Sequence, residues 1–143
     1  MCPQAPCPPT VGALSNPANA ILSRFDYWQL NEHRRRSEEL GSTQLARLIR
    51  AKMLAAAVVD SDQLAPDVVT GTARITFALD RQPAETRVLY HWSYPDDAHR
   101  CLRVGSPLGV TLIGMSAGQS SGWLDRSGTP RNVQVLSVAP NAP

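Results

Sequence analysis

The chain of 143 residues has little cysteine and no long apolar run. Its three cysteines, Cys2, Cys7 and Cys101, are an odd number without the spacing of a disulfide framework, so we expect free thiols. A membrane-spanning helix needs about 18 consecutive apolar residues, which the sequence lacks. The first residues also lack the basic and apolar regions of a signal peptide. We therefore predict a cytoplasmic protein that makes no membrane contact.

The chain also lacks a large excess of either charge, because its net charge is only +2. A dedicated nucleic-acid-binding domain usually carries a strong basic patch, so we expect no strong direct binding of DNA or RNA. The histidines His33, His91 and His99 lack the close spacing of a zinc site. No glycine-rich stretch is followed by the lysine of a phosphate-binding loop. We therefore expect neither metal nor cofactor, and no enzymatic activity.

What the sequence does have is proline at its start, with five prolines in residues 1–20. Such a segment buries too little apolar surface to offset its ordering entropy, so we predict a disordered tail over residues 1–20. Residues 21–60 are predicted to form a short antiparallel helical hairpin. Ser23 and Asp26 have capping-box spacing at its start, and Gly41 suits the end of the first helix. The apolar residues of the second helix follow the helical period: Leu45, Leu48, Ile49, Met53 and Ala56.

Residues 61–143 alternate between apolar and polar side chains in short runs, as half-buried strands do. We predict strands near residues 69–79, 88–92 and 102–104, and a closing hairpin of 123–124 with 133–138. The last strand has apolar residues on both faces, which predicts a central or bulged position. Ser106 and Pro107 suit the N-cap and the first position of a short helix. The pattern predicts an α+β fold with a small, mostly antiparallel sheet after the helical hairpin.

Residues 105–115, GSPLGVTLIGM, resemble the signature segment of the C-terminal domain of Gre-type transcription factors. In that family a serine–proline pair opens a short helix, a leucine or isoleucine followed by glycine closes it, and a hairpin ends the chain. Residues 65–70 and 88–97 are similar to regulators of nucleoside diphosphate kinase, which are relatives with a shortened helical arm. The resemblance covers about residues 63–138. This sequence departs from the family pattern at Gly71, Thr72, Ser120 and Ser121.

The resemblance implies an FKBP-like sheet domain that docks on RNA polymerase beside the secondary channel. It points to the segment around the short helix as the contact. An alternative remains for this segment, in which its serine and proline only cap the helix while Leu112 and Ile113 fill the core. The candidate polymerase-binding residues are Ser106, Pro107, Leu108, Gly109 and Met115.

In Gre factors a long coiled coil enters the channel, and acidic residues at its tip help to hold a catalytic metal. Here Glu38 and Glu39 lie near the tip of the predicted hairpin, whose helices are too short for that reach. An acid must reach the reacting group to act, so we expect no transcript cleavage. The single basic run, Arg34, Arg35 and Arg36, is a candidate contact for an acidic surface or nucleic acid, or simply a solvated helix face.

These observations predict a non-catalytic regulator of transcription elongation that binds bacterial RNA polymerase. A second reading is an adaptor of nucleoside diphosphate kinase, acting on it directly or through transcription. A third is a degenerate relative that keeps the fold and has lost the polymerase. Ser120 and Ser121 and the proline-rich tail keep the third reading open.

Overall fold

The computed structural model of the chain describes residues 20–92 and 100–139. Residues 1–19, 93–99 and 140–143 lie outside the described residues, and with them Cys2, Cys7, His99 and the predicted disordered tail except for its last residue. That residue, Ala20, is buried, so the tail was predicted one residue too long. Cys101 is a free, half-buried thiol. No helix in the described ranges is long and apolar enough to cross a membrane.

The helical hairpin consists of α1 (Arg24–Glu39) and α2 (Thr43–Ala55). The hydroxyl of Ser23 accepts a hydrogen bond from the backbone N–H of Asp26 at 3.0 Å, which confirms the predicted helix start. Gly41 has a φ of 81° just past the end of α1 and allows the tight reversal of the chain. Ser42 is the N-cap of α2 by position, but its side chain makes no capping hydrogen bond.

A second connection closes the base of this hairpin, and the sequence did not predict it. The short strands β1 (Ile21–Ser23) and β2 (Ala57–Val59) pair in parallel. The backbone N–H of Ile21 also donates to the carbonyl oxygen of Gly114 at 2.9 Å. Both legs of the hairpin are therefore tied at their base to each other and to the chain that follows α3. A 3₁₀ turn, η2 (Ser61–Gln63), then leads to the sheet.

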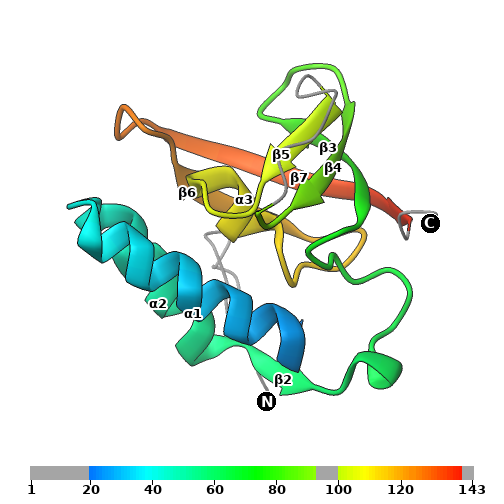
Figure 1. Cartoon of the computed structure of the whole chain (residues 1–143). Coiled ribbons are helices and arrows are strands. Elements are labelled where there is room, and N and C mark those ends of the chain that lie inside the picture. The colour runs from blue at the N-terminus through cyan, green and yellow to red at the C-terminus, as the bar shows by residue number, and fades with distance from the viewer. Residues whose placement is uncertain (1–19, 93–99, 140–143) are drawn as a thin grey trace, which may run out of the picture.

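The five-stranded sheet has the order β5-β4-β3-β7-β6, and α3 lies between this sheet and the hairpin (Figure 1). All neighbouring strands are antiparallel except β4 and β5, which are parallel. This arrangement confirms the predicted α+β class and the mostly antiparallel sheet. The elements are β3 (Arg74–Leu79), β4 (Glu85–Tyr90), β5 (Cys101–Arg103), α3 (Pro107–Leu112), β6 (Ser120–Leu124) and β7 (Pro130–Ala139).

Strand β7 lies between β3 and β6, and its register with β3 shifts between Thr76 and Phe77. The strand is thus both central and bulged, as its apolar residues on both faces predicted. Val133 and Val135 face the core, whereas Leu136 is 43% exposed. The first predicted strand was too long, because regular pairing begins only at Arg74.

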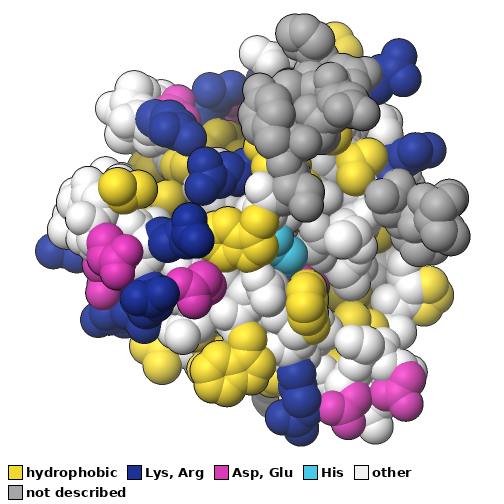
Figure 2. Space-filling view, in the orientation of Figure 1, with side chains coloured by type: hydrophobic (Ala, Val, Ile, Leu, Met, Phe, Trp, Pro, Cys, Tyr) yellow, Lys and Arg dark blue, Asp and Glu magenta, His cyan; other side chains and the backbone are white. Residues whose placement is uncertain are grey.

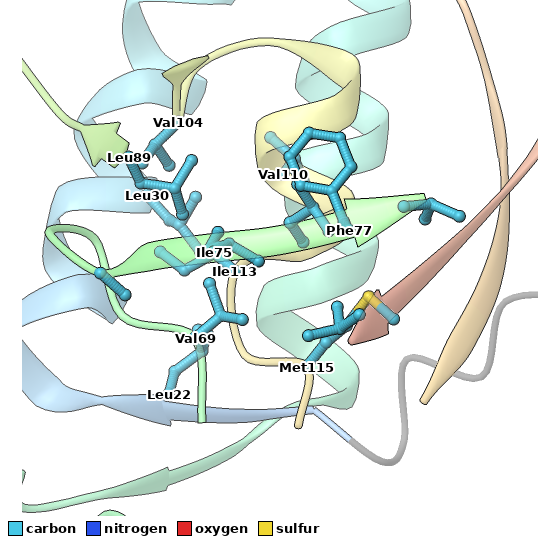
Figure 3. Packing of buried hydrophobic residues seen from close by; sticks show 14 of the residues in the cluster. Leu22, Leu30, Val69, Ile75, Phe77, Leu89, Val104, Val110, Ile113 and Met115 are labelled. Atoms are coloured by element: carbon cyan, nitrogen blue, oxygen red, sulfur yellow. The ribbon is translucent and has the colours of Figure 1, made fainter. Parts of the chain in front are cut away.

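The core is continuous across the sheet, α3 and the hairpin (Figure 3). Leu30 of α1 and Ile49 of α2 are fully buried beside residues of the sheet. Leu112 and Ile113 are fully buried as well, so these two residues fill the core as the alternative reading held. The labelled side chains that converge in Figure 3 are Leu22, Leu30, Val69, Ile75, Phe77, Leu89, Val104, Val110, Ile113 and Met115.

Ser106 and Ser42, two of the three serine N-caps, allow a matched test of capping. The hydroxyl of Ser106 accepts from the N–H of Gly109 at 3.1 Å and donates to the carbonyl oxygen of Arg103 at 2.7 Å. We expect Ser106→Ala to lower the free energy of unfolding by about 1 kcal/mol or more, since both hydrogen bonds are lost. Chemical denaturation followed by circular dichroism measures the change. Ser42→Ala is the control and should change stability by only a few tenths of a kcal/mol; equal losses would contradict the assignment.

Candidate functional site

The segment predicted to contact a partner is brought to one place by α3, but its residues differ in accessibility. Pro107 and Leu108 are half-buried at the first turn of the helix. Ser106 and Gly109 are buried and are joined by the N-cap hydrogen bond. Met115 is only 5% exposed and belongs to the core cluster, so its side chain is not presented to a partner in this conformation.

Gly109 is required by a close approach between α3 and the preceding strand. A Cβ at this position would lie 2.1 Å from the carbonyl oxygen of Arg103 and 2.7 Å from Cα of Val104. Only glycine lets the helix begin directly against the end of β5. This close contact fixes the orientation of the first turn of α3, which carries Pro107 and Leu108.

A groove of about 560 Å³ runs along α3, between α2 and the β6–β7 turn. Pro107 and Val110 form one side of it, and Leu45 and Leu48 of α2 form another. Trp123 closes the third side and also borders a smaller hollow next to Leu108. The groove is thus mainly apolar and opens beside the candidate segment. Sequence reasoning did not find it, because its walls come from three elements that are distant in the chain.

Lys52 lies at this groove, and its ammonium group is almost fully buried. Its Nζ donates to the carbonyl oxygens of Thr111 and Ile113 at 3.0 and 2.8 Å. These are carbonyls at the end of α3, where a helix leaves acceptors without partners. Burial lowers the pKa of Lys52 from 10.5 to about 7, since desolvation disfavours the charged form.

A buried chain of polar side chains joins α1 to the sheet domain. The carboxylate of Asp26 accepts from the backbone N–H of Gly71 at 3.1 Å and contacts Nε2 of His91 at 2.9 Å. A carboxylate only accepts, so Nε2 of His91 carries the proton. Nδ1 of His91 is in turn hydrogen-bonded to Nε2 of His33, 3.0 Å away. The three side chains thus form one continuous buried hydrogen-bonded chain.

The outer end of this chain is covered by an aromatic ring. Trp92 stacks on His33 with ring centroids 3.9 Å apart, and the guanidinium of Arg36 lies 4.8 Å from the Trp92 ring centroid. In Figure 2 a histidine side chain reaches the surface between hydrophobic side chains, with basic side chains nearby. Burial, together with the nearby His91, Arg103 and Arg36, lowers the pKa of His33 from 6.5 to about 3.

The acidic pair at the hairpin tip is held by arginines of the same hairpin. Glu38 pairs with Arg34 at 2.9 Å and with Arg50 at 2.8 Å. Glu39 pairs with Arg35 at 3.2 Å. The predicted basic run therefore does not form a free basic patch. Arg34 and Arg35 neutralise the tip carboxylates, and Arg36 covers Trp92.

These placements divide the predicted residues into two groups. Ser106, Pro107, Leu108 and Gly109 surround the start of α3, whereas the acidic and basic candidates occupy the far end of the hairpin (Figure 1). Sequence reasoning missed Lys52 and the Asp26–His91–His33 chain. The sequence does contain a signal for Lys52, because it is the single lysine among the 14 lysine and arginine residues. For the second, the departure from the resembled family pattern at Gly71 was the signal in the sequence.

Gly71 has no room for a side chain. A Cβ would lie 2.1 Å from Nε2 of His91 and 2.7 Å from Oδ1 of Asp26. We expect Gly71→Ala to break the buried chain and to lower the free energy of unfolding by about 2–4 kcal/mol, since buried polar groups would lose their partners. Thermal denaturation checks this. Thr72→Ala, at the exposed neighbouring position, is the control and should be nearly neutral.

The lowered pKa of His33 makes stability depend on pH. Between pH 7.5 and 5.5 the unfolded chain binds a proton on this histidine and the folded chain does not, so acid favours unfolding. His33 alone should lower the free energy of unfolding by about 1 kcal/mol over this interval, and its contribution should keep growing toward pH 3. His33→Gln keeps a side-chain N–H but does not titrate, and its stability should vary less with pH. Parallel pH profiles for the two proteins would contradict this account.

No protein-family model and no curated protein matches the sequence. Among solved structures, the chain is similar to the prokaryotic transcription elongation factor GreA/GreB from Nitrosomonas europaea, with a TM-score of 0.62 and 21% identity. The match covers 85% of this chain and 98% of that one. Gfh1 of Thermus aquaticus matches with a TM-score of 0.43 and 13% identity over 85% of this chain and 99% of that one. The chain thus has a Gre-like fold, in which a helical region precedes a curled, mostly antiparallel sheet.

Proposed function

We propose that this chain is a non-catalytic regulator of transcription elongation that binds bacterial RNA polymerase near its secondary channel. The observation that carries the proposal is the fold it shares with the Nitrosomonas europaea elongation factor over most of both chains. A fold alone does not establish a function, so the proposal also needs a surface that suits a protein partner.

The start of α3 supplies such a surface. Pro107 lies between the groove and the smaller hollow, and Leu108 borders the smaller hollow. Apolar side chains beside a concave surface are typical anchor positions at protein interfaces. The cap hydrogen bonds of Ser106 hold these anchors in place before a partner arrives, which lowers the entropy cost of binding.

The hairpin supports a role without catalysis. Helix α1 has 16 residues and is only about 24 Å long at roughly 1.5 Å per residue. Glu38 and Glu39 are engaged by arginines of their own hairpin, so their charges are already compensated. A carboxylate that helps to hold a catalytic metal has to be free to face it. We propose that the chain occupies the docking position and excludes longer channel-entering factors without cleaving RNA.

In this proposal residues 61–143 form the docking domain and residues 21–60 form a short arm. The closer resemblance to regulators of nucleoside diphosphate kinase remains a prediction from the sequence. The Nitrosomonas europaea protein whose fold this chain shares is a transcription elongation factor.

Pro107→Ala tests the docking surface. We expect the variant to bind core RNA polymerase about 5- to 30-fold more weakly than the wild type, which corresponds to about 1–2 kcal/mol. Binding is measured by fluorescence anisotropy of labelled protein titrated with core enzyme. Leu136→Ala, an exposed apolar residue on β7, is the matched control and should bind as the wild type does.

A Gre-type factor added as a competitor separates the remaining readings. Displacement of the bound chain would support the secondary-channel site. Binding without displacement would move the site elsewhere on the polymerase. Failure of the folded wild-type protein to bind at tens of micromolar would favour a relative that keeps the fold and has lost the polymerase.

A further inference from the structure

Lys52 stands apart from every other basic residue of the chain. It is the only lysine, and the remaining 13 of the 14 basic residues are arginines. Its side chain is buried, and its Nζ contacts two backbone carbonyl oxygens, those of Thr111 and Ile113. Within the described part of the chain, no carboxylate pairs with it. Only peptide dipoles stabilise its charge, which is a weak compensation for loss of water.

The consequence is a lysine that loses its proton near neutral pH. Burial lowers the pKa of Lys52 to about 7. A neutral amine keeps two N–H groups, one for each carbonyl, and gains a lone pair. An arginine at this position would stay protonated and could not act as a nucleophile. A lysine desolvated beside an apolar cavity is the usual way in which proteins make a reactive amine.

The groove beside Lys52 determines what could reach this amine. Its walls near Lys52 are Leu48 and Ala51 of α2 and Val110 of α3, with Trp123 on the opposite side. The charged groups around it lie on two elements, Arg47 on α2 and Asp125 and Arg126 at the β6–β7 turn. The part of a guest that lies next to Lys52 must therefore be apolar.

We propose that Lys52 is a covalent capture site at which an aldehyde with an apolar body forms a Schiff base in this groove. The amine lone pair attacks the carbonyl carbon and forms the C–N bond. The carbonyl oxygen takes up the two protons of the amine and leaves as water, and the C=N bond is formed. The step needs no oxidant, reductant or further reactant, and water is its only other product.

Capture changes the contact between α2 and α3. An imine nitrogen carries no hydrogen, and its protonated form carries one, so the carbonyls of Thr111 and Ile113 cannot both keep a donor. The end of α3 loses part of its attachment to the hairpin as a result. The same helix carries Pro107 at its start, so the guest acts on the segment that borders the groove. This inference does not depend on the identity of the partner that docks there.

The presence of a single lysine makes the test site-specific. The full-length protein is incubated with benzaldehyde at pH 7.5, reduced with cyanoborohydride and digested, and the labelled peptides are quantified by mass spectrometry. We expect labelling of Lys52 to be about tenfold or more faster in the folded protein than in urea-unfolded protein at the same pH. The rate should rise with pH to a half-maximal value near the pKa of about 7. The N-terminal amine serves as the internal reference.

Two variants and one second probe separate capture from general reactivity. Lys52→Arg should remove the label without affecting the N-terminal amine. Ala51→Trp, which fills the groove from an exposed position, should slow the reaction at Lys52 only. Glyoxylate, an aldehyde with a charged body, should label the N-terminal amine but not Lys52. Faster labelling of Lys52 in the unfolded than in the folded wild type would overturn the proposal, as would an unchanged rate in folded Ala51→Trp.

Discussion

The attachment of the helical hairpin to the sheet depends on one buried carboxylate. Asp26 lies in the first turn of α1, where its own N–H is taken by Ser23, and its two oxygens are shared between Gly71 and His91. Such a group is costly to bury unless all its bonds are made, and here the partners come from the sheet domain. The bonds are directional, so they fix the rotation of α1 as well as its distance. Apolar packing, as at the fully buried Leu30, is not directional in this way.

The groove follows from that fixed orientation. With α1 held, α2 can approach α3 from one side only, and its buried face brings Ile49 into the core and Lys52 to the end of α3. The cavity that remains is lined by Leu45 and Leu48 of α2, by α3 and by Trp123 of β6. The groove is thus a consequence of how three elements meet. Fold and cavity have to be considered together when a partner or ligand is sought.

The sequence predicted the parts of this structure that depend on local signals. Ser106 and Pro107 mark the start of α3 within a few residues, and Ser23 and Gly41 mark the bounds of α1 in the same way. The bulged central strand β7 was also foreseen, since burial on both faces leaves a continuous apolar run. Non-local features escaped prediction. Asp26 and His91 are 65 positions apart, Lys52 and Ile113 are 61 apart, and no pattern in the chain links them.

The closed base of the hairpin has a mechanical consequence. Because β1 and β2 are paired and Ile21 is bonded to Gly114, the two helices cannot shear past each other independently. The hairpin is thus attached at its base as one unit, with Glu38 and Glu39 at its opposite end. The tie at Gly114 lies just behind α3, so backbone hydrogen bonds connect the base of the hairpin to the helix that bears Pro107.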